Sequence, residues 1–292
     1  MSLMPAGLAL TAVLLASGTA LAQDTPVWEK SYSVADQPML DFEVSDSNLT
    51  IHSCGECRQV HVRVLLKNKK LSDYVLDEGQ SGNKVRFSLK DKPHIGVHFN
   101  WHGPESRSEV LIEAPAKVVL EARTQDGGLF VSGLRGDLNL RTSDGGQELD
   151  HLAGVLKLET SDGHIRLQES SGTVDARTSD GSMDVAGSFS ALQLHSSDGS
   201  IRADLTKSGN LSAQSLVESS DGGVTLLLPR SFAAEFDIHT HDGGIRSNLP
   251  LTLDGYNSKG DEGHAIHGKM NGGGALLTIR TDDGGVRLNT AS

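Results

Sequence analysis

The sequence is poor in aromatic residues, in cysteine and in basic side chains, and each shortage excludes something. Aromatic residues make up 4% of the 292 residues, which is little for the core of a globular β-sandwich. The chain contains only two cysteines, and two cysteines alone make a poor metal site. Its 26 Lys and Arg against 38 Asp and Glu leave a net charge of -12, whereas nucleic-acid binding needs a basic track. We therefore expect no nucleic-acid partner.

Long hydrophobic runs are also missing, except near the N-terminus. Residues 8–16 are apolar and are followed by Ala20, Leu21 and Ala22 before Gln23, which is the small-x-small cleavage pattern of a secretory signal. The run is too short to span a membrane, although it lacks the usual preceding Lys or Arg. We predict a signal peptide over residues 1–22, with an uncleaved anchor or a misassigned start as alternatives. The mature chain, without a transmembrane segment, would be exported and be periplasmic, cell-envelope associated or extracellular.

One short phrase returns along the chain on a fixed count. The phrase is Thr-Ser-Asp-Gly or a close variant, and its aspartates recur at one constant interval at Asp126, Asp144, Asp162, Asp180 and Asp198. It returns with looser spacing at Asp221, Asp242 and Asp283. A fixed period of about 18 residues indicates one small supersecondary unit, here called a coil, that is stacked on copies of itself.

The residues between these turns have the pattern of strands. In each of the eight copies, the positions six and four before the Asp and three and five after it are apolar, with Gln147, Ser215 and Ser247 as exceptions. Spacing by two on both sides of a turn indicates short strands. Each coil is therefore predicted to hold two strands, a turn at Asp-Gly and a second turn half a period later, near Gly136, residues 151–154, Gly172 and Gly187.

The fold class follows from the way the phrases repeat. An array of antiparallel hairpins could share the local pattern, but identical phrases at identical offsets favour stacking of like residues on like. We predict an all-β chain that forms a parallel β-solenoid, similar to a β-helix, with roughly 4.8 Å between coils. Residues 23–115 should form an irregular N-terminal β region that begins the stack and covers its first coil. Residues 116–292 should carry the repeats, with a loop insertion at 254–274.

The repeated aspartates have two interpretations. At a turn, an Asp side chain can bond the backbone two residues on while Gly supplies a conformation that other residues resist, and the preceding Thr or Ser can cap similarly. The alternative is a calcium ladder along Asp126, Asp144, Asp162, Asp180 and Asp198, because stacked carboxylates repel by roughly 1 kcal/mol even in water. One Asp per coil supplies few oxygens, and outward cations such as Arg141 and Arg166 can offset the charge. We expect no cofactor, with calcium as the alternative.

Cysteine and histidine give three further candidates. Cys54 and Cys57 fall at the place of the second turn, and in an exported chain a disulfide there is favoured over a free pair or a redox site. His94, His98 and His102 alternate with apolar residues, so neighbouring ones would be about 13 Å apart along a strand, too far to share an ion. The segment 254–274 is expected to be a polar loop or a coil cap, or alternatively a metal or ligand site, through Asp261, Glu262, His264 and His267.

Several motifs together resemble a known family. They are the strand 110–115 before the first phrase, the repeated Thr-Ser-Asp-Gly, the Leu-Leu-Leu-Pro of 226–229 before residues 236–240, and the glycine-rich ending 272–281. Over roughly residues 40–290 the chain is similar to the bacterial "putative adhesin" family of exported β-strand-repeat proteins, a domain of unknown function. The family usually has Asn or Ser before Gly-Asp, whereas this chain has Ser-Asp-Gly. The resemblance implies a solenoid at or outside the cell envelope and transfers no catalytic residues.

No catalytic constellation stands out in the sequence. Enzymes built on parallel β-helices use converging carboxylates, whereas Asp282 and Asp283 are neighbours that should point apart. Nucleophile-elbow, phosphate-loop and zinc-protease motifs are absent. We predict a non-enzymatic binding or scaffold surface with an envelope polysaccharide or a protein as its partner. The alternatives are a polysaccharide-active β-helix enzyme and an envelope-stress signalling component.

Overall fold

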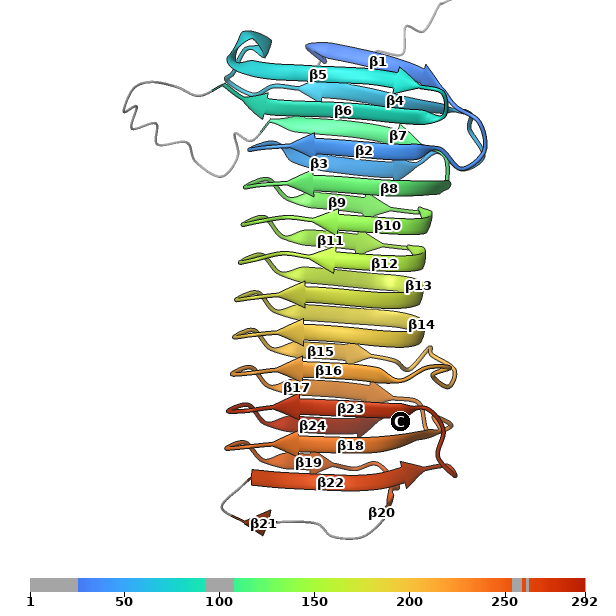
Figure 1. The fold of residues 1–292 in the computed structure, drawn as a ribbon, viewed down its shortest axis with the longest axis vertical. Helices are drawn as coiled ribbons and strands as arrows, with labels where there is room; N and C mark the ends of the chain where they lie inside the picture. The colour runs from blue at the N-terminus through green and yellow to red at the C-terminus, as the bar shows by residue number, and fades with distance from the viewer. Residues whose placement is uncertain (1–25, 93–107, 254–258, 261–262, 292) are drawn as a thin grey trace, which may run out of the picture.

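A computed structural model describes residues 26–92, 108–253, 259–260 and 263–291. The predicted signal peptide, His94, His98, His102, Asp261 and Glu262 lie outside the described residues. Within them the protein is all-β, with a single helical turn, η1 (Leu71–Asp73), and 24 strands hydrogen-bonded into one mixed, mostly parallel sheet (Figure 1). The described part contains no helix with the length and apolarity that crossing a membrane requires.

The strands are β1 (Trp28–Ser33), β2 (Met39–Val44), β3 (Asn48–Ser53), β4 (Gln59–Leu65), β5 (Tyr74–Ser81), β6 (Lys84–Asp91), β7 (Glu109–Ala114), β8 (Lys117–Thr124), β9 (Leu129–Ser132), β10 (Arg135–Arg141), β11 (Gln147–Asp150), β12 (Ala153–Glu159), β13 (Ile165–Thr178), β14 (Met183–Ser196), β15 (Ile201–Asp204), β16 (Ser215–Ser219), β17 (Val224–Leu228), β18 (Ala234–Thr240), β19 (Ile245–Ser247), β20 (Thr252–Leu253), β21 (Lys259–Gly260), β22 (Gly263–Met270), β23 (Leu276–Thr281) and β24 (Val286–Thr290).

The middle of the chain pairs with itself at the period of the repeat. Strand β10 lies between β8 and β12, and Leu138 is in register with both Leu120 and Leu156, each one repeat away along the chain. Strand β11 lies in the same way between β9 and β13. All of these pairs are parallel, so like positions stack on like positions, as the identical offsets predicted.

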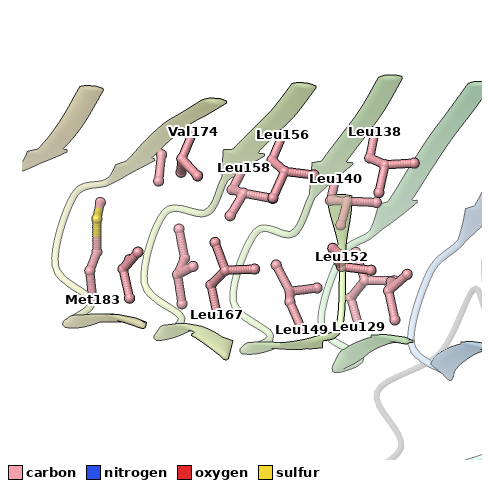
Figure 2. Packing of buried hydrophobic residues seen from close by; sticks show 14 of the residues in the cluster. Leu129, Leu138, Leu140, Leu149, Leu152, Leu156, Leu158, Leu167, Val174 and Met183 are labelled. Carbon is pink, nitrogen blue, oxygen red and sulfur yellow. The ribbon is translucent and has the colours of Figure 1, made fainter. Parts of the chain in front are cut away.

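The sheet bends back on itself at the turns and thereby presents two faces. Face A contains β6, β2, β8, β10, β12, the second halves of β13 and β14, then β16, β23 and β18. Face B contains β7, β3, β9, β11, the first halves of β13 and β14, then β15, β17, β24 and β19. Figure 2 shows their inward side chains meeting in a narrow file, in which Leu138, Leu156 and Val174 oppose Leu129, Leu149 and Leu167. Each face therefore contributes a single layer of side chains to the core.

The glycine after each repeated Asp is needed for close approach, not for an unusual conformation. A Cβ on Gly145, Gly163 or Gly181 would collide with the backbone carbonyl of the equivalent glycine in the preceding coil. The φ angles of these glycines lie outside the left-handed region, so the expectation that they supply a conformation other residues resist is wrong for this turn. That role belongs to the second turn, where Gly136 and Gly154 have φ of 133° and 119°.

The three polar exceptions in the core pattern have separate explanations. Gln147 is fully buried, and its Nε2 donates to the carbonyls of Glu159 (2.7 Å) and Leu140 (3.2 Å), while its Oε1 has no partner. Ser215 is also buried, and its Oγ accepts a hydrogen bond from the backbone N–H of Leu192 at 3.0 Å. Ser247 is exposed at the end of the stack. The apolar pattern thus tolerates polar groups that find backbone partners or reach solvent.

At the C-terminal end, the order of coils in space differs from their order in the chain. The final coil, β23 and β24, inserts between β16 with β17 and β18 with β19. Figure 1 accordingly places the C-terminus inside the stack, with β22 beyond β18 at its end. Of the two structures expected for residues 254–274, a polar loop or a coil cap, residues 263–270 show the cap, because they form β22 and pair antiparallel with β18. This pairing covers the N–H and C=O groups that β18 would otherwise expose.

At the N-terminal end, too, the order of coils in space differs from their order in the chain. The coil of β2 and β3 lies between β8 with β9 on one side and β6 with β7 on the other, all in parallel pairs. Beyond them the pairing becomes antiparallel, with β5 on β6, β4 on β7 and β1 on β4. Residues 39–53 thus continue the stack, and the remaining strands before β8 build an end cover for it.

Candidate functional site

Face A carries charged side chains at regular intervals because every second residue of each strand points outward. Several of these charges pair between adjacent coils. Arg141 Nε lies 3.3 Å from Glu159 Oε2, and His195 Nδ1 lies 3.3 Å from Glu218 Oε2. The coils are roughly 4.8 Å apart, so the face is a flat array in which polar groups recur at that spacing.

A shallow depression interrupts this array near the N-terminal end of face A. Its lining includes Met39, Val119, Asp137 and Val155, which occupy one column of the register across β2, β8, β10 and β12. Met39 and Val155 are 49% and 55% exposed, which is unusual for apolar side chains of this size. The charged and amide groups around them are Asp41, Lys84, Glu121, Asn139 and Lys157. The depression therefore combines an apolar floor with polar groups, a combination typical of binding sites.

At the Asp-Gly turns the hydroxyl groups of Thr and Ser hold the backbone. Thr160 Oγ1 accepts a hydrogen bond from Gly163 N at 3.2 Å and donates to the carbonyl of Ser143 in the preceding coil at 3.1 Å. The same arrangement recurs at Thr178 and Thr281. Asp126, Asp144, Asp162, Asp180 and Asp198 lie at the surface of these turns. The inward Thr or Ser two positions before the Asp thus caps the turn, as expected for that hydroxyl, and a buried hydroxyl requires such partners.

The alternative of a calcium ladder finds no compact set of ligands among the described residues. Among the residues that the structure describes, the repeated carboxylates do not come together in threes at a distance that one ion could bridge. A tighter acidic group lies at the N-terminal end of the row. Burial, then the charges of Asp91 and Asp126, raise the pKa of Asp46, while Lys69 Nζ lies 2.8 Å from Asp91 Oδ1 and 4.0 Å from Asp46 Oδ2. Lysine here supplies the positive charge that an ion would otherwise bring.

Cys54 and Cys57 form a disulfide in the turn that follows β3. Their Cα atoms are 5.8 Å apart. The turn is also held by the backbone, since Cys54 N donates to Ala114 O at 2.9 Å and Ala116 N donates to Gly55 O at 2.8 Å. The disulfide therefore occupies the second-turn position expected from the sequence.

A histidine and aspartate cluster lies on face A at the C-terminal end. Asp237 and His239 are two residues apart on β18, so both point outward, and His267 stands directly opposite Asp237 on β22. Asp237 Oδ1 lies 2.7 Å from His239 Nε2 and 2.7 Å from His267 Nδ1. His264 is in register with the inward Thr240, and its Nδ1 is buried without a partner among the described residues.

Sequence reasoning found only part of this cluster. His267 was a candidate with His264, but the structure places these two residues on opposite sides of β22. Asp237 and His239 were missed. Their signal is an Asp-x-His spacing on an amphipathic strand, and its significance depends on the antiparallel pairing with β22 that no local pattern indicates.

Comparison with known proteins gives the family of the chain. A family model described as "Toastrack DUF4097" matches residues 39–289. The chain belongs to this family. The resemblance noted in the sequence is thereby confirmed, and the toastrack match runs from β2 into β24, so β1 is the strand outside it. One similar solved structure is a "putative cell adhesion protein" from Clostridium sporogenes, with 12% identity, a TM-score of 0.31, and coverage of 91% of this chain and 100% of that one. No curated protein matches this toastrack chain.

Proposed function

We propose that this toastrack protein is an exported, non-enzymatic β-solenoid that uses face A to bind a linear polymer of the cell envelope, with polysaccharide as the favoured class. The observation that carries the proposal is the periodicity of the face. Charges and amides recur at the coil spacing beside the depression of Met39 and Val155. A polymer with regularly repeated hydroxyl or charged groups can meet such an array at several places at once, which multiplies weak contacts.

Two features support export. The residues before the matched domain have the apolar run and cleavage pattern of a signal peptide. The disulfide between Cys54 and Cys57 belongs to an oxidising compartment, since thiols of this kind stay reduced in a bacterial cytosol. The protein would then act in the periplasm, at the envelope or outside the cell.

A binding role fits the surface better than catalysis. Glu159 and Glu218 on face A pair with Arg141 and His195 of adjacent coils, so these carboxylates are held by neighbouring side chains and do not converge with each other. Glycoside hydrolysis needs two carboxyl groups that face one substrate bond. The array therefore resembles a surface for recognition, and a protein partner in envelope signalling is the alternative occupant.

The purified full chain can be incubated with peptidoglycan and a panel of acidic and neutral polysaccharides, with co-sedimentation and polymer shortening measured in the same tubes. We expect saturable binding without shortening. A matched pair of charge reversals locates the surface, since Lys157→Glu alters face A and Arg166→Glu alters face B. Lys157→Glu should weaken binding about tenfold, and Arg166→Glu should leave it unchanged.

Each other outcome is informative. Shortening of any polymer would overturn the non-enzymatic proposal. Equal effects of the two reversals would remove face A as the binding surface. Absence of binding to every polymer would overturn the polysaccharide proposal and favour a protein partner.

A further inference from the structure

We propose that Asp237, His239 and His267 form a binding site for a divalent transition-metal ion of the zinc class. The site would lie on the outer surface of face A, across the last parallel strand, β18, and the antiparallel end strand, β22. It is independent of polymer binding. Among the described residues, these three form the one group whose His, Asp, Glu or Cys ligand atoms come close enough to hold a single ion, all within 4.8 Å of one another.

The geometry brings three ligands to one point from two strands. Side chains two apart on a strand share a face, which joins Asp237 to His239, and the direct cross-strand position brings in His267. The two imidazole rings meet edge to face, with centroids 5.1 Å apart and planes at 70°. A tetrahedral zinc site separates its ligand atoms by roughly 3.3 Å. The two 2.7 Å contacts would open by about half an ångström, and the two imidazole nitrogens, which lie within 4.8 Å of each other, would move to the same separation.

The ligand types select the class of metal. Two imidazole nitrogens and one carboxylate oxygen suit zinc, copper or nickel, whereas calcium and magnesium prefer sites made of oxygen. The site is also reachable, because the side chains of His239 and His267 are 43% and 44% exposed. Three protein ligands leave a fourth position for water or for a ligand from another molecule.

The position of the site gives the ion a structural consequence. His267 belongs to the strand that covers the end of face A, and Asp237 and His239 belong to the strand it covers. An ion held by all three would link these strands through bonds absent from the unfolded chain, and binding to the folded state alone stabilises it. Without metal, the same side chains can satisfy one another through hydrogen bonds to Asp237 Oδ1. Metal titration separates these two arrangements.

The test uses the full chain purified without a histidine tag and dialysed against a chelator. Isothermal titration at neutral pH with zinc should show one ion bound per chain, and the same titration with calcium or magnesium should show none. Zinc should also raise the melting temperature, and this rise should shrink at acidic pH because a metal binds only neutral imidazole. Cobalt in place of zinc should give an absorption spectrum without the charge-transfer band of a thiolate ligand, which excludes Cys54 and Cys57.

Variants decide whether these residues hold the ion. His267→Gln and Asp237→Asn should each weaken zinc binding at least tenfold and abolish the rise in melting temperature. The matched control is His195→Gln, because His195 also contacts a carboxylate on face A, that of Glu218, but does not belong to a three-ligand group among the described residues. Circular dichroism shows that each variant is folded. Absence of stoichiometric zinc binding, or equal losses in His195→Gln and His267→Gln, would overturn the proposal.

Discussion

The middle of this protein and its two ends bury their apolar side chains and pair their backbone groups in different ways. Between β8 and β14, each coil buries its apolar side chains and satisfies its backbone by repeating its neighbour at a constant offset along the chain. At the ends there is no further copy to pair with. Segments distant in the chain meet there, and parallel pairing gives way to the antiparallel pairing of β1, β4, β5 and β22. The middle of the stack thus consists of pairings at one constant offset, whereas each end consists of pairings that break this offset.

The difference has a physical origin in the strand edges. A stack of parallel coils leaves unpaired N–H and C=O groups at each end, which would invite another chain to add. Burying the last coil in sequence between two others, and covering β18 with β22, leaves β18 without an exposed edge on face A. In the middle of the stack the constraint lies at every Asp-Gly turn, where the backbones of adjacent coils approach too closely to admit a side chain. Substitutions in the two regions should therefore differ in their cost.

The largest expected effect is in the middle of the stack, at the glycines that directly follow the repeated aspartates. Gly163→Ala should lower the free energy of unfolding by about 3 kcal/mol or more, because the added methyl group meets the carbonyl of Gly145 and the stacked backbones have no room to move. The control is Gly244→Ala, which adds a methyl group one position later in a looser copy of the same phrase, where it meets nothing. Urea unfolding of both variants measures the difference. Equal stability of the two would show that close approach does not govern the turn.

A moderate effect is expected at Thr160, whose hydroxyl group caps the same turn. Thr160→Val keeps the shape of the side chain but leaves the buried Gly163 N–H without the oxygen that accepts its hydrogen bond. Loss of this bond should cost about 1 to 2 kcal/mol. Ser161→Ala removes a hydroxyl from an exposed neighbour and should change stability by less than about 0.5 kcal/mol. A cost for Ser161→Ala as large as that for Thr160→Val would contradict the assignment of the cap to Thr160.

The contrast between body and ends also sets what the sequence could predict. The inward positions of the middle, such as Leu138 and Leu156, were predictable because one constant period places them all. The insertion of β23 beside β16 was not predictable, since it depends on pairing between segments that are distant in the chain and break the period. The pairing of Asp237 with His267 was missed for the same reason, although His267 itself was a candidate. Close approach at Gly163 was also hidden, because sequence alone does not distinguish a glycine needed for space from one needed for its φ angle.

The smallest expected effect is at the N-terminal end, where the charged side chain of Glu78 joins strands of the two faces. Glu78 on β5, the edge of face A, accepts hydrogen bonds from Lys30 Nζ (2.6 Å) and Tyr32 Oη (2.7 Å) on β1, the edge of face B. These two bonds lower the pKa of the Glu78 carboxyl, with Lys30 the larger cause. Burial and the bond to Glu78 raise the pKa of Tyr32 above its usual value. The three side chains thus tie the outermost strands of the two faces together.

The lowered pKa fixes the direction of a pH effect. A carboxyl group whose pKa is lower in the folded protein contributes stability above its unfolded pKa of about 4.3, and loses that contribution as the pH falls through the folded value. Glu78→Gln should therefore destabilise the protein at pH 7 by less than about 1 kcal/mol, since Lys30 and Glu78 are partly exposed. The difference from the unaltered protein should shrink as the pH falls from 5 to 3 in urea unfolding. Glu56→Gln, an exposed change at the nearby turn, should show no such trend, and a difference for Glu78→Gln that stays constant with pH would mean that shape, and not charge, joins β1 to β5.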